Sequence, residues 1–442
     1  MLAPLGGAMS TQDHTDKPLG FWSCWSLVVG CMIGSGIFLV PTQLAPYGLL
    51  SFGGWIIAGA GSIALALVFG RLAARTQCNG GPYAYARQSF GDFTGFLMGW
   101  AYWLSFVIGV PTVAIAFVGY LGVFIPALNG NPLAQLAAAI ALIGAFTYIN
   151  IRGLKEMSAA QITLTLLKIV PLVAIIGLAV PAGSAENLPS FNPSGGSIFA
   201  ALAATALIAL WPFTGFEVVT LPATNVKDCE RTIPRALITG MLTVVVIYLC
   251  ASAAVMLLVP AAQLAQSTAP FADAARAFGP WGPNVIAAGA LVATAGTING
   301  LIFSCGQMPM AVAADKLAPA WLAHTTKRGT PHLALILSAV LGSLMLALNY
   351  ARGFLDAFEF LLKMATSLGL IYYVVVALAE LRHSWRSAKG WASVAVIGIA
   401  YSLFAAFGSG LEVLFWGVAL MAAGVPLYFL FRRDIAAVSP TS

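Results

Sequence analysis

Three ionisable side chains stand inside long apolar stretches of this sequence: Lys168, Glu217 and Lys363. A charge inside a membrane is expensive, so such groups are functional candidates by default. Glu217 is the clearest case, and two roles stay open for it: a protonatable gate or switch, or a structural cap in its own helix. Lys363 follows Glu359 by four residues, the favourable order for a helical ion pair, which predicts a structural or rim role. Screening of substrates at an outer mouth is the alternative for Lys363.

Two segments in the middle of apolar stretches are expected to interrupt a helix. Residues 30–38 (GCMIGSGIF) contain three glycines and a serine, and residues 211–217 (WPFTGFE) contain a proline, a glycine and Glu217. Glycine costs about 1 kcal/mol relative to alanine inside a helix, and proline removes a backbone donor. Either segment alone is also consistent with a packing motif or a harmless kink. Together they occupy the first helices of two successive halves, which predicts a transporter site between inverted repeats.

The two interruptions suit the two ends of an α-amino acid. Unwinding at residues 34–36 exposes backbone N–H groups at a new helix N-terminus, which favours a carboxylate. Unwound carbonyl groups at residues 211–215 suit an ammonium group. The pattern therefore predicts binding of a zwitterionic substrate at mid-membrane.

The composition is that of a membrane protein. Of 442 residues, 60% are hydrophobic and 8% are charged, and the mean hydropathy is +0.90. A soluble chain carries about 25% charged residues. Apolar runs of at least about 18 residues recur from end to end and are long enough to cross a bilayer as helices. The alternating segments of about ten residues that mark a membrane β-barrel are not evident.

These runs predict an all-α polytopic membrane protein with twelve transmembrane helices. The expected domains are an N-terminal tail (1–19), a first repeat of five helices (20–181), a second repeat of five (197–380), two peripheral helices (389–432) and a C-terminal tail (433–442). The expected spans are 20–42, 50–74, 92–126, 132–151, 157–181, 197–222, 233–260, 279–315, 332–350, 354–380, 389–407 and 411–432.

The basic residues predict the orientation. Seventeen of the 21 Lys and Arg fall in tails or loops of one side, and the other four are Arg276, Arg352, Lys168 and Lys363. The positive-inside rule then places both termini in the cytoplasm. The net charge of +6 reflects this topology and does not indicate nucleic-acid binding.

Motifs of enzymes and metal sites are lacking. The sequence has no P-loop, GxSxG or HExxH, its four histidines fall in tails or loops, and its six cysteines show no CxxC spacing. We therefore expect no enzyme activity, no metal site, no disulfide framework and no cofactor.

The chain resembles the amino acid–polyamine–organocation superfamily, in particular its bacterial basic amino acid/polyamine antiporter branch, which includes the arginine/agmatine antiporters. The resemblance rests on residues 34–38 (GSGIF), 79–85 (NGGPYAY) with 90–91 (FG), 211–217 (WPFTGFE) and 233–236 (IPRA), in order over nearly the whole chain. It implies a LeuT-type fold, which is a 5+5 inverted repeat followed by two peripheral helices. It also implies a monomer or a homodimer in the lipid bilayer.

The resemblance assigns roles to single residues. Ser35 and Gly36 match the backbone site for the substrate carboxylate, Trp211 the aromatic gate, and Glu217 a carboxylate linked to proton sensing. A third-helix asparagine that reads a guanidinium falls near Val110, and an eighth-helix tryptophan falls near Leu301, so arginine specificity is in doubt. The expected substrate-binding residues are Ile33, Ser35, Gly36, Trp211, Phe213, Gly215, Leu301 and Tyr373, with Ile298 and Ile371 as further walls.

Lys168 lies where sodium-coupled carriers of this type hold a sodium ion, and in sodium-independent relatives a lysine at a matching position replaces that ion. We therefore predict sodium-independent transport; a lysine extended toward the cytoplasmic surface is the structural alternative. The predicted function is a secondary-active amino acid permease or antiporter that works by alternating access. The substrate is an amino acid or a polyamine-like cation, with protons as an expected partner. The alternatives are an obligatory arginine/agmatine-type exchanger, a channel, a membrane enzyme or a transporter-like sensor.

Overall fold

The computed structural model describes residues 19–76, 80–152, 157–221, 223, 226–327 and 329–438. The remaining residues include the expected N-terminal tail to residue 18 and also Cys78, Asn79, Lys155 and Arg328, which lie outside the described part. Within that part the chain is helical, apart from one isolated bridge between Leu19 and Val226.

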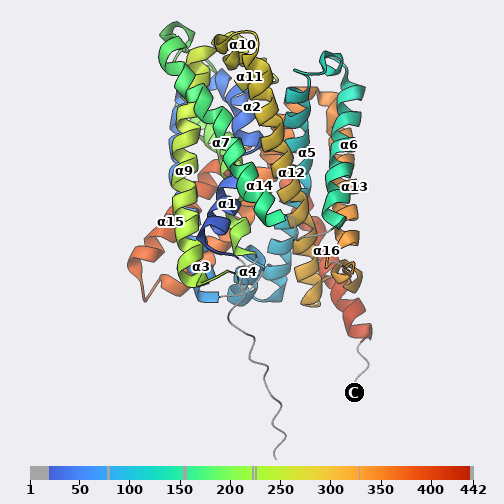
Figure 1. Ribbon diagram of the computed structural model, residues 1–442. Helices are drawn as coiled ribbons and strands as arrows, with labels where there is room; N and C mark the ends of the chain where they lie inside the picture. The colour runs from blue at the N-terminus through green and yellow to red at the C-terminus, as the bar shows by residue number, and fades with distance from the viewer. Residues whose placement is uncertain are drawn as a thin grey trace, which may run out of the picture.

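The helices follow the expected order and stand side by side as an upright bundle (Figure 1). The long helices are α3 (Leu50–Thr76), α5 (Asp92–Leu121), α6 (Pro132–Arg152), α7 (Met157–Ala182), α9 (Cys229–Leu258), α12 (Gly282–Ala314), α13 (His332–Asn349), α14 (Phe354–Ser384), α15 (Lys389–Phe407) and α16 (Leu411–Val438). The shorter ones are α1 (Phe21–Met32), α2 (Ser35–Leu44), α4 (Pro82–Phe90), α8 (Ile198–Leu210), α10 (Ala261–Leu264) and α11 (Pro270–Ala274). The 3-10 turns used below are η4 (Trp211–Phe213), η5 (Phe216–Thr220) and η8 (Ala320–Ala323).

Eleven spans in the described residues are long and apolar enough to cross a membrane, with α1 and α2 forming one of them. The expected sixth span is represented by a shorter apolar helix, Ile198–Phe213, which is interrupted before it reaches that length. The third expected span, α5, ends at Leu121 rather than at residue 126, because a new 3-10 turn begins with Pro126, which has no backbone N–H to donate. The last helix continues to Val438, past its expected end at residue 432.

Burial separates central helices from peripheral ones. The apolar window of α5 is 89% buried and that of α14 is 72% buried, whereas the windows of α6 and α16 are 17% and 22% buried. The first pair therefore forms the centre of the bundle, and the second pair faces its surroundings. In Figure 1 the α3–α4–α5 connection and the end of α16 lie at the lower end, and α10, α11 and the end of α2 lie at the upper end.

Two helices are broken near the middle of the bundle. The first break separates α1 from α2 at Ile33 and Gly34. A Cβ atom on Gly34 would lie 2.3 Å from Thr297 Oγ1 of α12, so only glycine fits here. The second break follows α8, where Gly215 adopts a left-handed conformation (φ 96°) between η4 and η5. That conformation costs a glycine little and strains other residues.

Candidate functional site

The N-terminus of α2 forms one wall of the candidate site. It begins with Ser35, Gly36 and Ile37, all of which are buried. The first N–H groups of a helix have no partner within the helix, and they carry partial positive charge. The break in the first span therefore places a helix N-terminus, with its partial positive charge, in the middle of the protein.

The second break lies directly against this helix N-terminus. A Cβ atom on Gly36 would lie 2.7 Å from the Cα atom of Pro212, so the two backbones touch there. Trp211 Nε1 donates to Ser35 Oγ over 3.4 Å, and the indole is only 7% exposed. The structure therefore brings together the two segments that the sequence predicts as one site.

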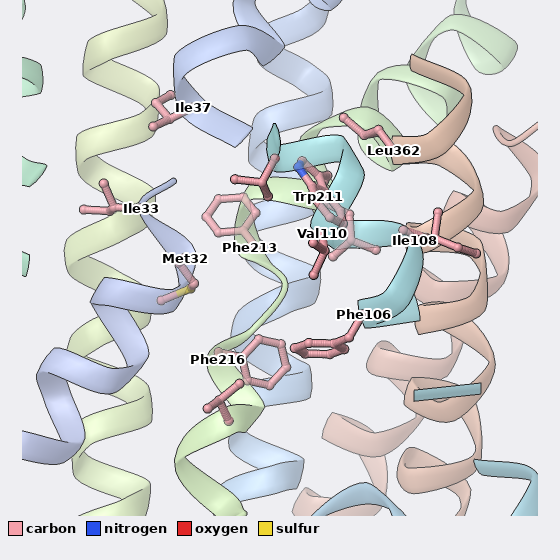
Figure 2. Close-up of a cluster of buried hydrophobic side chains, with 14 of the residues drawn as sticks. Met32, Ile33, Ile37, Phe106, Ile108, Val110, Trp211, Phe213, Phe216 and Leu362 are labelled. Carbon is pink, nitrogen blue, oxygen red and sulfur yellow. The ribbon is translucent and has the colours of Figure 1, made fainter. Parts of the chain in front are cut away.

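The walls around Trp211 are apolar. Figure 2 shows its ring beside Val110 of α5. A Cβ atom on Gly109 would contact both the Trp211 ring, at 3.0 Å, and the Leu301 side chain of α12, at 3.7 Å. Val110 and Leu301 thus lie on the same side of the site as the aromatic ring. Neither offers a hydrogen bond to a guanidinium or a distal ammonium group.

Two other predicted residues belong to the packing around the site. Phe213 is fully buried, with its ring 5.8 Å from Trp55 and 5.3 Å from Tyr248. In Figure 2 the Ile33 side chain points away from Trp211. Its backbone carbonyl instead accepts from Thr297 Oγ1 at 3.3 Å. The structure thus gives these two residues a supporting position beside the break.

Glu217 joins the second break to α14. Its carboxylate is fully buried and accepts from Tyr372 OH at 2.8 Å, from Tyr373 OH at 3.1 Å and from the backbone N–H of Gly215 at 3.1 Å. The Tyr372 ring also packs on Tyr102 of α5, with centroids 5.2 Å apart. One carboxylate thus connects the turn after η4 with a central helix.

Lys168 joins α7 to the first break and to α12. Its ammonium is fully buried and donates to the carbonyl of Gly30 at 2.8 Å and to Thr297 Oγ1 at 3.2 Å. Gly30 lies in the last turn of α1, so the lysine supplies positive charge where helix carbonyl groups end. The side chain therefore lies in the protein interior and does not extend to the surface.

Comparison with known proteins decides the family. The amino acid permease family matches residues 19–430, which is nearly the whole chain. The cadaverine/lysine antiporter of Escherichia coli strain K12 is 30% identical over 407 residues, covering 89% of this chain and 90% of that protein. The chain belongs to the amino acid permease family. It is a multi-pass membrane protein of a transporter family and not an enzyme, as the sequence predicts.

Further relatives of the permease are named as antiporters or polyamine transporters. The putrescine transporter of Haemophilus influenzae is 30% identical over 410 residues, covering 90% of this chain and 93% of that protein. The arginine/ornithine antiporter of Pseudomonas aeruginosa is 26% identical over 450 residues, covering 96% of this chain and 93% of that protein. The predicted resemblance to the basic amino acid/polyamine branch is thereby confirmed.

At the upper end of the bundle, α2 of the permease is held by hydrogen bonds to its neighbours. Tyr120 OH donates to the carbonyl of Phe38 at 2.6 Å and accepts from the N–H of Phe271 at 3.3 Å, which ties α2 to α5 and α11. Thr42 Oγ1 adds a bond of 2.9 Å to the carbonyl of Ser267. These contacts must break before α2 can move away from the rest of the bundle.

At the lower end, the start of α1 is held by the chain that follows η5. The N–H of Lys227 donates to the carbonyl of Leu19 at 2.9 Å. Hydrogen bonds therefore tie α2 to its neighbours at the upper end and the start of α1 to a following segment at the lower end.

Three residues of the permease site are missed by sequence reasoning. Tyr248 OH of α9 donates to the carbonyl of Met32 at 2.6 Å and lies 3.2 Å from the carbonyl of Pro212, so it stands between both breaks. Thr297 contacts Lys168 and the first break, and Tyr372 shares Glu217 with the predicted Tyr373. A signal was available for the two tyrosines, because tyrosine in a membrane helix usually lies at the interface and these two lie within their spans.

Proposed function

We propose that this permease is a secondary-active, sodium-independent antiporter for a cationic amino acid or a polyamine. The observation that carries the proposal is the direct apposition of the two helix breaks, where Gly36 touches Pro212 and Ser35 accepts from Trp211. This arrangement offers unpaired N–H groups and unwound carbonyl groups within a few ångströms of each other. The names of the relatives supply the substrate class.

The substrate carboxylate would bind the N-terminus of α2. It would displace the Trp211 indole from Ser35, because that 3.4 Å bond is long and weak. The freed indole could then cover a cationic substrate, and an ammonium or guanidinium over an aromatic ring gains about 0.5–2 kcal/mol. A polyamine has no carboxylate, so it would rely on the aromatic face and on the carbonyl groups of the second break.

Lys168 would serve in place of a coupling cation. A sodium ion at this place would have to bind the same carbonyl of Gly30 and the same Thr297 hydroxyl that the ammonium already occupies. The tethered charge holds α1, α7 and α12 together without an ion from solution. This supports sodium-independent transport.

Glu217 would act as the switch of alternating access. It links the second break to Tyr372 and Tyr373, so opening the lower end requires these bonds to break. Protonation would remove the charge that makes them strong. We place this switch in a twelve-span, 5+5 repeat with both termini in the cytoplasm, so the lower end of Figure 1 would be the cytoplasmic end.

A neutral amino acid permease is the second candidate. It is favoured by Val110 and Leu301, which line the Trp211 side of the site and offer no polar group to a distal cation. An apolar wall binds an aliphatic side chain and leaves a buried cation without a partner. Obligatory exchange of arginine for agmatine would require a guanidinium to bind beside the same apolar side chains, Val110 and Leu301.

The experiment is uptake into proteoliposomes. Labelled lysine, arginine, ornithine, putrescine, cadaverine and leucine are added outside, with vesicles either empty or loaded with unlabelled substrate, and with sodium replaced by choline. We expect uptake of a cationic substrate into loaded vesicles, unchanged in choline. Leucine uptake into empty vesicles would establish the second candidate, and loss of uptake in choline would refute the role of Lys168.

A Trp211→Leu variant separates the two substrate classes. Removal of the aromatic face should weaken binding of the cationic substrate by about tenfold, since cation–π contacts in desolvated sites contribute up to about 2 kcal/mol. It should change leucine binding much less, because leucine replaces one apolar surface by another. Equal losses for both substrates would contradict the proposed cation–π contact.

A further inference from the structure

An apolar cavity of about 340 Å³ lies at the lower end of the bundle, away from the substrate site. Its walls come from the first turns of α5, the last turns of α12, the start of α13, the end of α16 and the turn η8. In Figure 1 the lower parts of α12, α13 and α16 lie together at the right of the bundle. The volume is within the range of about 300–1,000 Å³ that is typical of small-molecule sites.

The chemistry of the cavity excludes the permease's own substrates. None of the residues that line it is ionisable, and representative walls are Phe96, Met308 and Leu427. Two of the indoles that line it, the half-buried Trp100 and the buried Trp103, use their N–H groups elsewhere: Trp100 donates to the carbonyl of Leu420 at 2.8 Å, and Trp103 donates to Ser338 at 2.8 Å. Their rings therefore present only apolar surface to the cavity. A charged amino acid would lose its hydration there without compensation.

The rim of the cavity, meaning the chain that flanks its lining residues, carries two lysines. Lys316 lies two residues before the lining residue Ala318, and Lys327 follows the lining segment of η8; both are exposed. The nearest acidic group, Asp315, is already engaged, with Arg87 Nη1 and Tyr83 OH each 2.7 Å from one of its carboxylate oxygens. Hydrogen bonds to Asp92 and Asp315 raise the pKa of Arg87, so its guanidinium stays charged and paired with these carboxylates. These two lysines put positive charge on the chain that flanks the cavity lining.

The position of the cavity matches the boundary between hydrocarbon and headgroups. Trp321 of η8 lines the cavity and is 42% exposed, as expected of an indole at a membrane interface. The surrounding helix α16 is one of the two least buried spans found in the described residues, at 22%, so this side of the cavity faces the surroundings of the bundle. An apolar recess with a basic rim at this level fits one ligand chemistry: a hydrocarbon chain attached to an anion.

We propose that this cavity binds one acyl chain of an anionic phospholipid of the adjoining leaflet, with the headgroup phosphate near Lys316 and Lys327. The chain would fill the recess between α5, α12 and α16, and Trp321 would stand at the level of the glycerol esters. The lipid would thereby join the peripheral α16 to the central helices. This role is independent of which substrate the permease transports.

The first test varies the cavity. Purified permease in detergent is mixed with phosphatidylglycerol or phosphatidylcholine, and bound lipids are counted by native mass spectrometry. Leu427→Trp fills the recess from a half-buried position, and Leu403→Trp is the matched control on the exposed face of α15. We expect Leu427→Trp to weaken binding of the most tightly held phosphatidylglycerol molecule at least about tenfold. Leu403→Trp should leave that binding unchanged. Equal retention in both variants would overturn the proposal.

The second test varies the rim. The Lys316→Glu/Lys327→Glu variant is compared with Arg386→Glu/Lys389→Glu, which reverses two exposed charges elsewhere in the permease. Each basic group near an anionic surface strengthens binding several-fold, so the rim variant should reduce the preference for phosphatidylglycerol over phosphatidylcholine by about tenfold or more. The control variant should retain that preference. If phosphatidylcholine binds the wild type as tightly, or if Leu427→Trp changes only a monomer–dimer equilibrium, the proposed lipid site is refuted.

Discussion

The carboxylate of Glu217 can be tested with two substitutions that separate its charge from its shape. Glutamine keeps the size and one acceptor oxygen. That oxygen can accept from Gly215 N–H and Tyr373 OH, which both bond to the same carboxylate oxygen, while the new amide donates to Tyr372 OH. Leucine keeps the bulk and removes every acceptor. We expect Glu217→Gln to fold normally and lose the pH response, and Glu217→Leu to be unstable.

The magnitudes follow from the hydrogen bonds. A bond to a charged group contributes about 1.5–3 kcal/mol, and a buried donor left unpaired costs about 1–3 kcal/mol. The two tyrosine hydroxyls can rotate toward each other because their rings are 4.6 Å apart, but the N–H of Gly215 cannot. Glu217→Leu should therefore destabilise the closed form by about 3–6 kcal/mol. Glu217→Gln should cost at most about 1 kcal/mol, because all three partners stay paired.

The assay combines thermal unfolding with exchange rates in proteoliposomes at several pH values between about 5 and 8. Wild-type exchange should change with pH, and Glu217→Gln should exchange at a rate that varies little over this range. Glu217→Leu should unfold at a markedly lower temperature. A Glu217→Gln variant with the wild-type pH profile, or a Glu217→Leu variant as stable as the wild type, would refute the reasoning.

Three further outcomes are expected. Lys168→Met should slow exchange at least about tenfold because it removes two charge-assisted bonds. Lys363→Met loses a partly buried i,i+4 pair with Glu359, which contributes about 0.2–0.5 kcal/mol, and should exchange within about twofold of wild type. Gly36→Ala should abolish most transport because its Cβ would strike the second break, and Gly144→Ala, with open space around it, should not. Glu380→Gln should lower the free energy of unfolding by about 2–4 kcal/mol, measured by thermal or denaturant unfolding in detergent, since it leaves two arginines of α3 without their buried partner. Wild-type exchange in Lys168→Met, wild-type transport in Gly36→Ala, or wild-type stability in Glu380→Gln would each contradict the contact on which that prediction rests.

The amino-acid sequence by itself determined the membrane class, the order of the helices and the two breaks. These are local properties: an apolar run of sufficient length must be helical in lipid, and glycines or a proline within it weaken the helix at that point. The matching positions of the breaks in the two halves also identified Ser35, Trp211 and Glu217 as candidate site residues. The family resemblance added the role expected of Lys168.

The tertiary structure alone decided what each of these groups touches. Glu217 meets Tyr372 from 155 residues away, and Lys168 meets Thr297 from 129 residues away. In a soluble helix the polar face reveals which side is buried, but helices such as α12 are apolar on every side, so the sequence does not show which side faces the bundle. The rotation of each helix, and with it the position of Tyr248 across both breaks and of Phe213 in the packing, is set only by close contact with neighbouring helices.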